Sequence, residues 1–95
     1  MKLTIVAKSD REVFAGIDEN GDFVVLSLDD SREIELGDVL SHGDWNTVGF
    51  ETVTNLTKAG SVRICIEDWG CAKARALDLL RRLNSPTKIT TLQGH

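Results

Sequence analysis

The sequence predicts a mainly β domain with one C-terminal α-helix (α+β). We expect a small, strongly bent antiparallel sheet or a partly open barrel of five or six strands. Three observations support this fold class: a clear hairpin pattern over residues 13–28, further short segments with alternating apolar residues, and one apolar stripe with helical spacing near residue 80. The 95 residues suit one domain, and we assign residues 1–84 to it.

The hairpin pattern is the clearest local feature. Asn20-Gly21 is a strong signal for a two-residue type I′ turn, in which both central residues need a positive φ. This turn predicts a register in which Ile17 faces Val24 and Gly16 faces Val25. One face of the hairpin is then wholly apolar, with Val13, Ala15, Ile17, Val24, Leu26 and Leu28.

The opposite face of this predicted hairpin carries Phe14, Phe23 and Val25. Two alternatives explain apolar side chains on that face. Either another segment folds over them, or they form an exposed patch of the kind that marks a binding site. We therefore treat the three residues as candidate binding residues. The predicted helix needs an apolar surface to cover, and this face is one candidate.

Four further segments have the β-branched or alternating composition of strands: Lys2–Ala7, Arg32–Leu36, Val48–Leu56 and Ser61–Glu67. Val39-Leu40 is a short apolar pair. In the third segment Val48 and Phe50 share one parity, and Val53 has the other. A β-bulge near Glu51-Thr52 would reconcile them.

A helix is predicted over about residues 69–83, with Asp68 as its N-cap. Its apolar stripe consists of Ala72, Ala76, Leu79, Leu80 and Leu83. Asn84-Ser85-Pro86 ends the helix. Residues 85–95 are expected to form a flexible or loosely attached tail, or to add a short strand through Lys88-Ile89-Thr90. The whole order resembles OB-like and SH3-like barrels in architecture alone, and such a resemblance carries no function.

The charge is distributed unevenly along the chain. Residues 1–70 hold six basic and fourteen acidic side chains, and residues 71–95 hold five basic and one acidic. An acidic body repels phosphate, which argues against broad nucleic-acid binding by that surface. No apolar run is long enough to span a membrane, and Lys8 and Asp10 interrupt the N-terminal apolar run too early for a signal peptide. We expect a cytoplasmic protein that does not associate with a membrane.

Residues 41–47, SHGDWNT, form the most irregular and polar segment, and we predict a loop there. His42, Asp44 and Trp45 are candidate binding residues, since tryptophan is enriched at the energetic centres of interfaces. Trp45 suits a binding role and a core role equally well. Trp69, just before the predicted helix, suits the core better.

Little in the sequence indicates catalysis. Cys71 falls in the first turn of the predicted helix, where backbone N–H groups and Arg75 could lower a thiol pKa, and Cys65 lies six residues earlier. Buried, inert cysteines are the commoner case. Residues 18–22 lack the glycine and glutamate spacing of a calcium loop. We therefore expect no metal, no cofactor and no enzymatic activity.

Three functions are compatible with these patterns. The first is a non-catalytic binding or regulatory domain that recognises a protein partner or self-associates. The second is an OB- or SH3-like module that binds single-stranded nucleic acid through aromatic stacking, aided by the basic residues of the helix. The third is a thiol enzyme or redox sensor centred on Cys71. The acidic body and the scarcity of aromatic residues favour the first.

Overall fold

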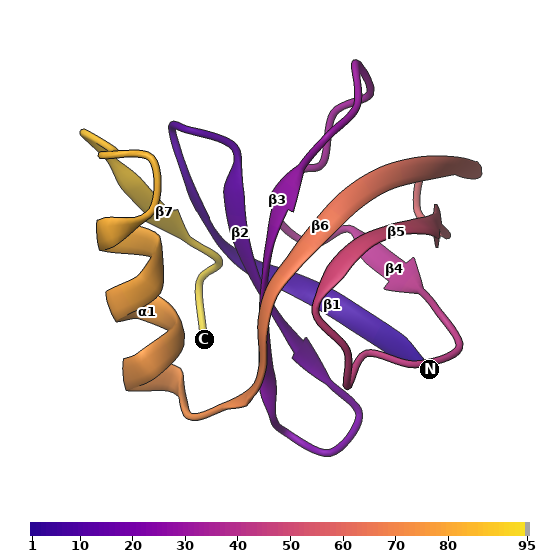
Figure 1. Ribbon diagram of the computed structural model, residues 1–95, viewed down its shortest axis with the longest axis horizontal. Helices are drawn as coiled ribbons and strands as arrows, with labels where there is room; N and C mark the ends of the chain where they lie inside the picture. The colour runs from indigo at the N-terminus through magenta and orange to yellow at the C-terminus, as the bar shows by residue number, and fades with distance from the viewer. Residues whose placement is uncertain (95) are drawn as a thin grey trace.

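Residues 1–94, the part described by this computed structural model, form seven β-strands and one helix (Figure 1). The elements are β1 (Lys2–Ser9), β2 (Val13–Asp18), β3 (Phe23–Leu28), β4 (Val39–Ser41), β5 (Gly49–Asn55), β6 (Gly60–Cys71), α1 (Lys73–Arg82) and β7 (Ile89–Thr91). Antiparallel pairing in the order β1-β2-β3-β6-β5-β4 returns to β1 and closes a six-stranded barrel, and β7 adds to β1. The predicted fold class is confirmed, with a barrel that is closed. Within the described residues, no helix has the length and apolar character needed to cross a membrane.

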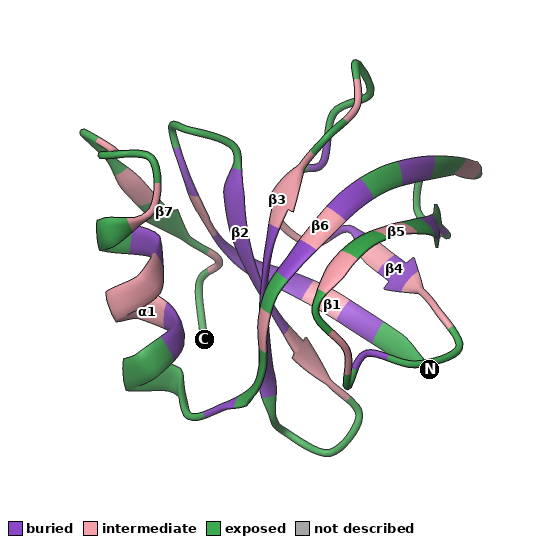
Figure 2. Cartoon of the chain, in the orientation of Figure 1, coloured by how far each residue is buried: buried purple, intermediate pink, exposed green. Residues whose placement is uncertain are grey.

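The hydrophobic core has two parts, because the β1-β2-β3 sheet is apolar on both faces. Figure 2 shows the buried residues along these three strands. One part fills the barrel and includes Phe14, Trp45 and Leu3. The other lies outside the barrel, where α1 covers the second face of β2 and β3 with Ala76 and Leu80. The helix therefore closes a face of the sheet that would otherwise expose apolar side chains to water.

The register predicted for the hairpin is wrong by one residue. Ile17 pairs with Phe23 and Gly16 pairs with Val24. The turn is longer than two residues: the Gly21 N–H donates to the Asp18 carbonyl, and Gly21 has a φ of 85°. These features describe a three-residue loop with a left-handed glycine, which Asn-Gly also permits. The Asp18 carboxylate stabilises the loop because it accepts hydrogen bonds from the backbone of Asn20 and Asp22.

Because of this shift, each residue of β2 shares a face with residues of β3 that were predicted to lie on the opposite face. Phe14 pairs with Leu26 and points into the barrel, whereas Val25 and Phe23 share the face under α1. The predicted grouping of Phe14 with Phe23 and Val25 is therefore wrong. Gly16 faces the barrel interior, where a Cβ atom on this residue would overlap the side chain of Leu3. The hairpin and the start of β1 are packed too closely for a larger residue there.

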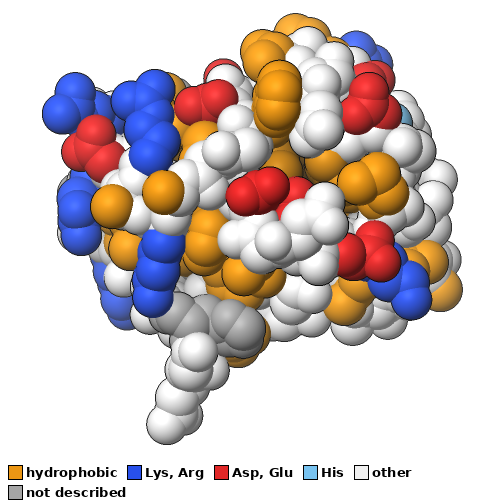
Figure 3. Space-filling view, turned by 90° about the horizontal axis from the view of Figure 1, so that it is seen from below, with side chains coloured by type: hydrophobic (Ala, Val, Ile, Leu, Met, Phe, Trp, Pro, Cys, Tyr) orange, Lys and Arg blue, Asp and Glu red, His pale blue; other side chains and the backbone are white. Residues whose placement is uncertain are grey.

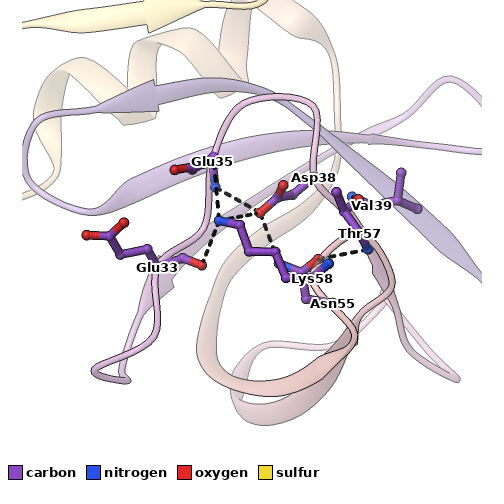
Figure 4. A network of polar contacts seen from close by, with 7 residues as sticks. All are labelled: Glu33, Glu35, Asp38, Val39, Asn55, Thr57 and Lys58. Atoms are coloured by element: carbon purple, nitrogen blue, oxygen red, sulfur yellow. Dashed lines mark hydrogen bonds and ion pairs between the residues drawn. The ribbon is translucent and has the colours of Figure 1, made fainter.

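Residues 32–36 were predicted to form a strand and instead form an irregular loop. A buried polar network holds this loop in place (Figure 4). The Asp38 carboxylate, only 3% exposed, accepts hydrogen bonds from the Glu35 N–H and the Asn55 side chain, both at 3.0 Å. The Lys58 ammonium lies 3.1 Å from the same carboxylate and also donates to the Glu33 carbonyl. Hydrogen bonds from side chains thus take the place of the backbone hydrogen bonds that a strand would have made with a neighbour.

Strands β5 and β6 and the helix also differ from the prediction. β5 pairs with β6 without a bulge, so Val53 points into the barrel and Phe50 points out. β6 continues to Cys71 because it must pair with β3 as well as β5. The helix consequently begins at Lys73, and Ala72 is its N-cap in place of Asp68.

The C-terminal segment contains the short strand that was one of the two alternatives for residues 85–95. Ile89 pairs with Ser9 and Thr91 pairs with Ala7. The Thr87 backbone N–H and hydroxyl both donate to the Asp10 carboxylate. The segment from 87 to 91 is therefore hydrogen-bonded to β1 and to Asp10, which follows β1.

Candidate binding surface

The loop 42–48 connects β4 to β5, and it holds three of the predicted site residues. Trp45 is fully buried in the barrel, and its Nε1–H donates to the Met1 carbonyl at 3.0 Å. His42 is half-buried with its ring edge against Trp45, and its Nε2 lies 3.5 Å from a Glu51 carboxylate oxygen. Asp44 is exposed and accepts a hydrogen bond from the Asn46 N–H. The loop is thus anchored by Trp45, whose role is to pack the core.

Phe14, Phe23 and Val25 are all buried, at 3%, 8% and 0% exposure. Of the two alternatives given for them, the structure supports coverage by other segments. The barrel interior encloses Phe14, and α1 covers Phe23 and Val25. They present no surface to a partner, so the interpretation of these residues as an exposed binding patch is wrong.

The exposed apolar side chains lie on other strands, which the sequence analysis did not select. Val48, just before β5, and Phe50, near the start of that strand, are 64% and 63% exposed. Trp69, near the end of the neighbouring strand β6, is 42% exposed. Trp69 lies beyond Ile66, the last residue of β6 that pairs with β5. We call these three residues the apolar β5–β6 surface. The sequence did contain an indication of this exposure. Phe50 and Val53 are three residues apart, so in a strand without a bulge their side chains must point to opposite faces.

Trp69 is exposed because β6 is irregular at this end. The pairing of β6 with β3 shifts register on both sides of Val25, opposite Asp68, and Gly70 has a φ of 62°. Such bulges bend a strand and re-aim its side chains. The Trp69 backbone N–H donates a hydrogen bond to the Asp68 carboxylate. This carboxylate also lies 3.5 Å from the Arg75 side chain of the helix. The prediction that Trp69 belongs to the core is therefore wrong.

The charges near this surface are mostly negative. Glu67 lies on β6 and Asp44 lies in the loop before β5, whereas Glu51 belongs to the inward row of β5 and is paired with His42. Arg63 lies 5.9 Å from the Phe50 ring centre, in cation–π range, but is itself paired with Asp29 at 3.3 Å. Lys and Arg side chains gather instead on the side of the molecule that carries α1 (Figure 3).

Neither cysteine has the surroundings of a reactive thiol. Burial, followed by the carboxylate of Asp68, raises the pKa of Cys71 to about 11, although Arg75 acts in the opposite direction. Cys71 ends β6 and does not lie in the first turn of a helix, so the predicted effect of helical N–H groups is absent. Burial and the charge of Glu67 raise the pKa of Cys65 as well. Both thiols stay protonated at neutral pH.

Two surface grooves flank the irregular loop 32–36. One, of about 400 Å³, is lined by the end of β1, by Glu33 and Glu35 and by Lys88. The other, of about 440 Å³, is lined by the same two glutamates with Arg32 and Lys58. Among the residues that the structure describes, neither lining contains a histidine or cysteine that could act as a base or nucleophile near pH 7. Within residues 1–94, no three His, Cys, Asp or Glu side chains converge as a metal site would require.

Comparison with known proteins adds no family or relative. No protein-family model matches this chain, and neither a curated protein nor a solved structure is significantly similar to it. Function must therefore be argued from the surface itself.

Proposed function

We propose that the protein is a non-catalytic binding domain that recognises a protein partner through the apolar β5–β6 surface. The observation that carries this proposal is the exposure of Phe50 on β5, of Val48 just before it, and of Trp69 on the adjacent strand β6. These side chains are among the largest apolar groups that the fold leaves in water.

Physical chemistry favours this use of the surface. A large aromatic side chain that folding does not bury gains free energy when a partner covers it, at about 25 cal/mol per Å² of apolar area. Tryptophan in particular is enriched among the residues that dominate interface energies. The raised thiol pKa of Cys71 favours binding over catalysis, as does the lack of a histidine among the described residues that line either groove.

The proposal is tested by affinity capture with the wild-type protein and with Phe50→Ser. Leu56→Ser is the matched control, because Leu56 is a half-exposed apolar residue at the other end of β5. We expect a protein that is retained by the wild type and by the control, and that is depleted at least about tenfold by Phe50→Ser. Equal retention by all three proteins would refute the proposal.

Self-association is a second route to the same kind of function. Two copies could bury the same apolar β5–β6 surface around a two-fold axis. Light scattering across a dilution series distinguishes this route. A dimer that Phe50→Ser dissociates supports it, and a protein that stays monomeric at every concentration excludes it.

Binding of single-stranded nucleic acid is the alternative, favoured by one observation: Phe50 and Trp69 are exposed aromatic rings on the outside of a barrel. Glu67 on β6 and Asp44 in the loop before β5 would repel phosphates. Trp69 is the exposed tryptophan, so its fluorescence would report oligonucleotide binding. A saturable change that weakens with salt supports this alternative. No change at tens of micromolar protein excludes it, since even non-specific affinities are about 10⁻⁴ to 10⁻⁶ M.

A further inference from the structure

Strand β5 is paired along only part of one side. All seven of its residues pair with β6, but only Asn55 and Thr54 pair with β4. β4 has three residues and lies beside one end of β5, as Figure 1 shows. The barrel is thus closed at the end of β5, and the start of β5 is an edge.

The backbone groups exposed at this edge can be identified. The Leu56 N–H donates to the Val39 carbonyl of β4 at 2.8 Å. Because alternate residues of a strand direct their N–H and C=O groups to opposite sides, Thr52 and Phe50 direct theirs to the same side as Leu56. Within residues 1–94, no hydrogen bond occupies these four groups. They are two donors and two acceptors in strand geometry.

The outward side chains along this edge do not protect it, and the one inward charge, Glu51, is paired with His42. Proteins usually prevent pairing at an exposed edge with lysine, proline, bulges or inward charges. The outward residues of β5 carry no charge and are Phe50, Thr52 and Thr54. The residues that flank the strand in the same row, Val48 and Leu56, are apolar, and none of the five is proline. Such an edge can accept another strand, as in the recognition of extended peptides by sheet edges.

The surrounding charges indicate the chemistry of that strand. Asp44 lies in the loop before β5 and Glu67 lies on β6, whereas Glu51 is paired with His42 and Arg63 with Asp29. A segment with lysine or arginine beside its apolar residues would complement these carboxylates, and an acidic segment would be repelled.

We propose that the partner contributes an extended apolar and basic segment, which pairs as an added strand with the Phe50–Thr52 edge of β5. This inference rests on the proposed protein-binding function and specifies its mode. The backbone bonds would provide affinity at this edge, and the Val48 and Phe50 side chains would favour apolar residues at alternate positions of the segment.

The first test uses amide hydrogen exchange on the whole chain, with a short peptide of alternating valine and lysine as the probe. In the free protein, the amides of Phe50 and Thr52 should exchange faster than those of Glu51 and Val53, which point to β6. Saturating peptide should slow both edge amides by at least about tenfold. A peptide with glutamate in place of lysine should bind more weakly. Failure of the valine–lysine peptide to slow these two amides would overturn the proposal.

Backbone changes test the pairing itself. Thr52→Pro removes one edge N–H that makes no bond to β6, and Thr52→Val is the control that keeps it. We expect Thr52→Pro to weaken peptide binding at least about tenfold and Thr52→Val to leave it within about twofold. Two peptides N-methylated at odd or at even residues give an independent test without altering the protein. One should bind and the other should not, and equal binding of both would overturn strand addition.

The two proposals fail in different ways. A captured protein that is lost with Phe50→Ser but retained with Thr52→Pro would leave the proposed function intact and refute strand addition. If both variants retained the captured protein, both proposals would be refuted.

Discussion

The Asp38 network gives the sharpest prediction about stability. Asp38→Ala removes the acceptor for the Glu35 N–H, the Asn55 amide and the Lys58 ammonium. The first two donors would be left without a partner in a largely buried site, at a cost of about 1–3 kcal/mol each. Lys58 is about a third exposed and can return to water, so its contribution is small. We expect Asp38→Ala to lower the free energy of unfolding by about 3 kcal/mol.

Equilibrium unfolding in urea measures this change. With a slope of about 1.5 kcal/mol per M, the midpoint should fall by about 2 M. Lys58→Met is the informative comparison, because it removes the partially exposed cation and keeps the acceptor. It should cost about 1 kcal/mol or less. A loss below about 1 kcal/mol for Asp38→Ala would refute the reasoning that this carboxylate holds the 32–38 loop in place.

The same network predicts a pH dependence. Burial acts to raise the pKa of Asp38, but hydrogen bonds from Asn55, the Glu35 N–H and Lys58 outweigh it and hold the pKa below its usual value. A lowered native pKa stabilises the fold above the unfolded value of about 3.9, and this contribution is lost as the pH falls further. The stability difference between wild type and Asp38→Ala should therefore shrink below about pH 4. A difference that stays constant from pH 6 to acid would contradict the assignment.

Three further predictions address packing and thiol chemistry. Gly16→Val should destabilise the protein by about 2 kcal/mol in urea unfolding, because its side chain would overlap Leu3, and a neutral effect would contradict the close packing. Trp45→Phe should cost about 1–2 kcal/mol in the same assay through loss of the hydrogen bond to the Met1 carbonyl, and a stabilised variant would show that this bond is unimportant. Iodoacetamide at pH 8 should alkylate Cys71 at least about tenfold more slowly than a free peptide thiol, and a comparable rate would contradict its raised pKa.

Much of the fold could be predicted from local patterns. The alternation in β5 and β6 and the spacing of Ala76 and Leu80 correctly indicate strands and a helix, because each element must bury one face. The register of the hairpin could not be predicted with the same success. Asn20-Gly21 suits both a two-residue and a three-residue loop, and a shift of one residue moves Phe14 to the opposite group of side chains.

The candidate site was harder to predict, because residue type alone does not determine exposure. Trp45 lies in a polar loop yet packs inside the barrel, since the loop folds back over the end of the core. Phe50 lies in a strand yet faces solvent, because β5 pairs with β6 without the expected bulge. Trp69 depends on irregular pairing between β3 and β6, which is a tertiary feature with no local signal.

The most direct test of the proposed function places a photo-crosslinking residue in the apolar β5–β6 surface. Phe50 would be replaced by p-benzoyl-phenylalanine, and Arg82 on the exposed side of α1 would receive the same group as the control. After irradiation in lysate of the native host, we predict a polypeptide adduct at position 50 and none at position 82. The absence of an adduct at position 50, or an adduct that nuclease removes, would contradict the account.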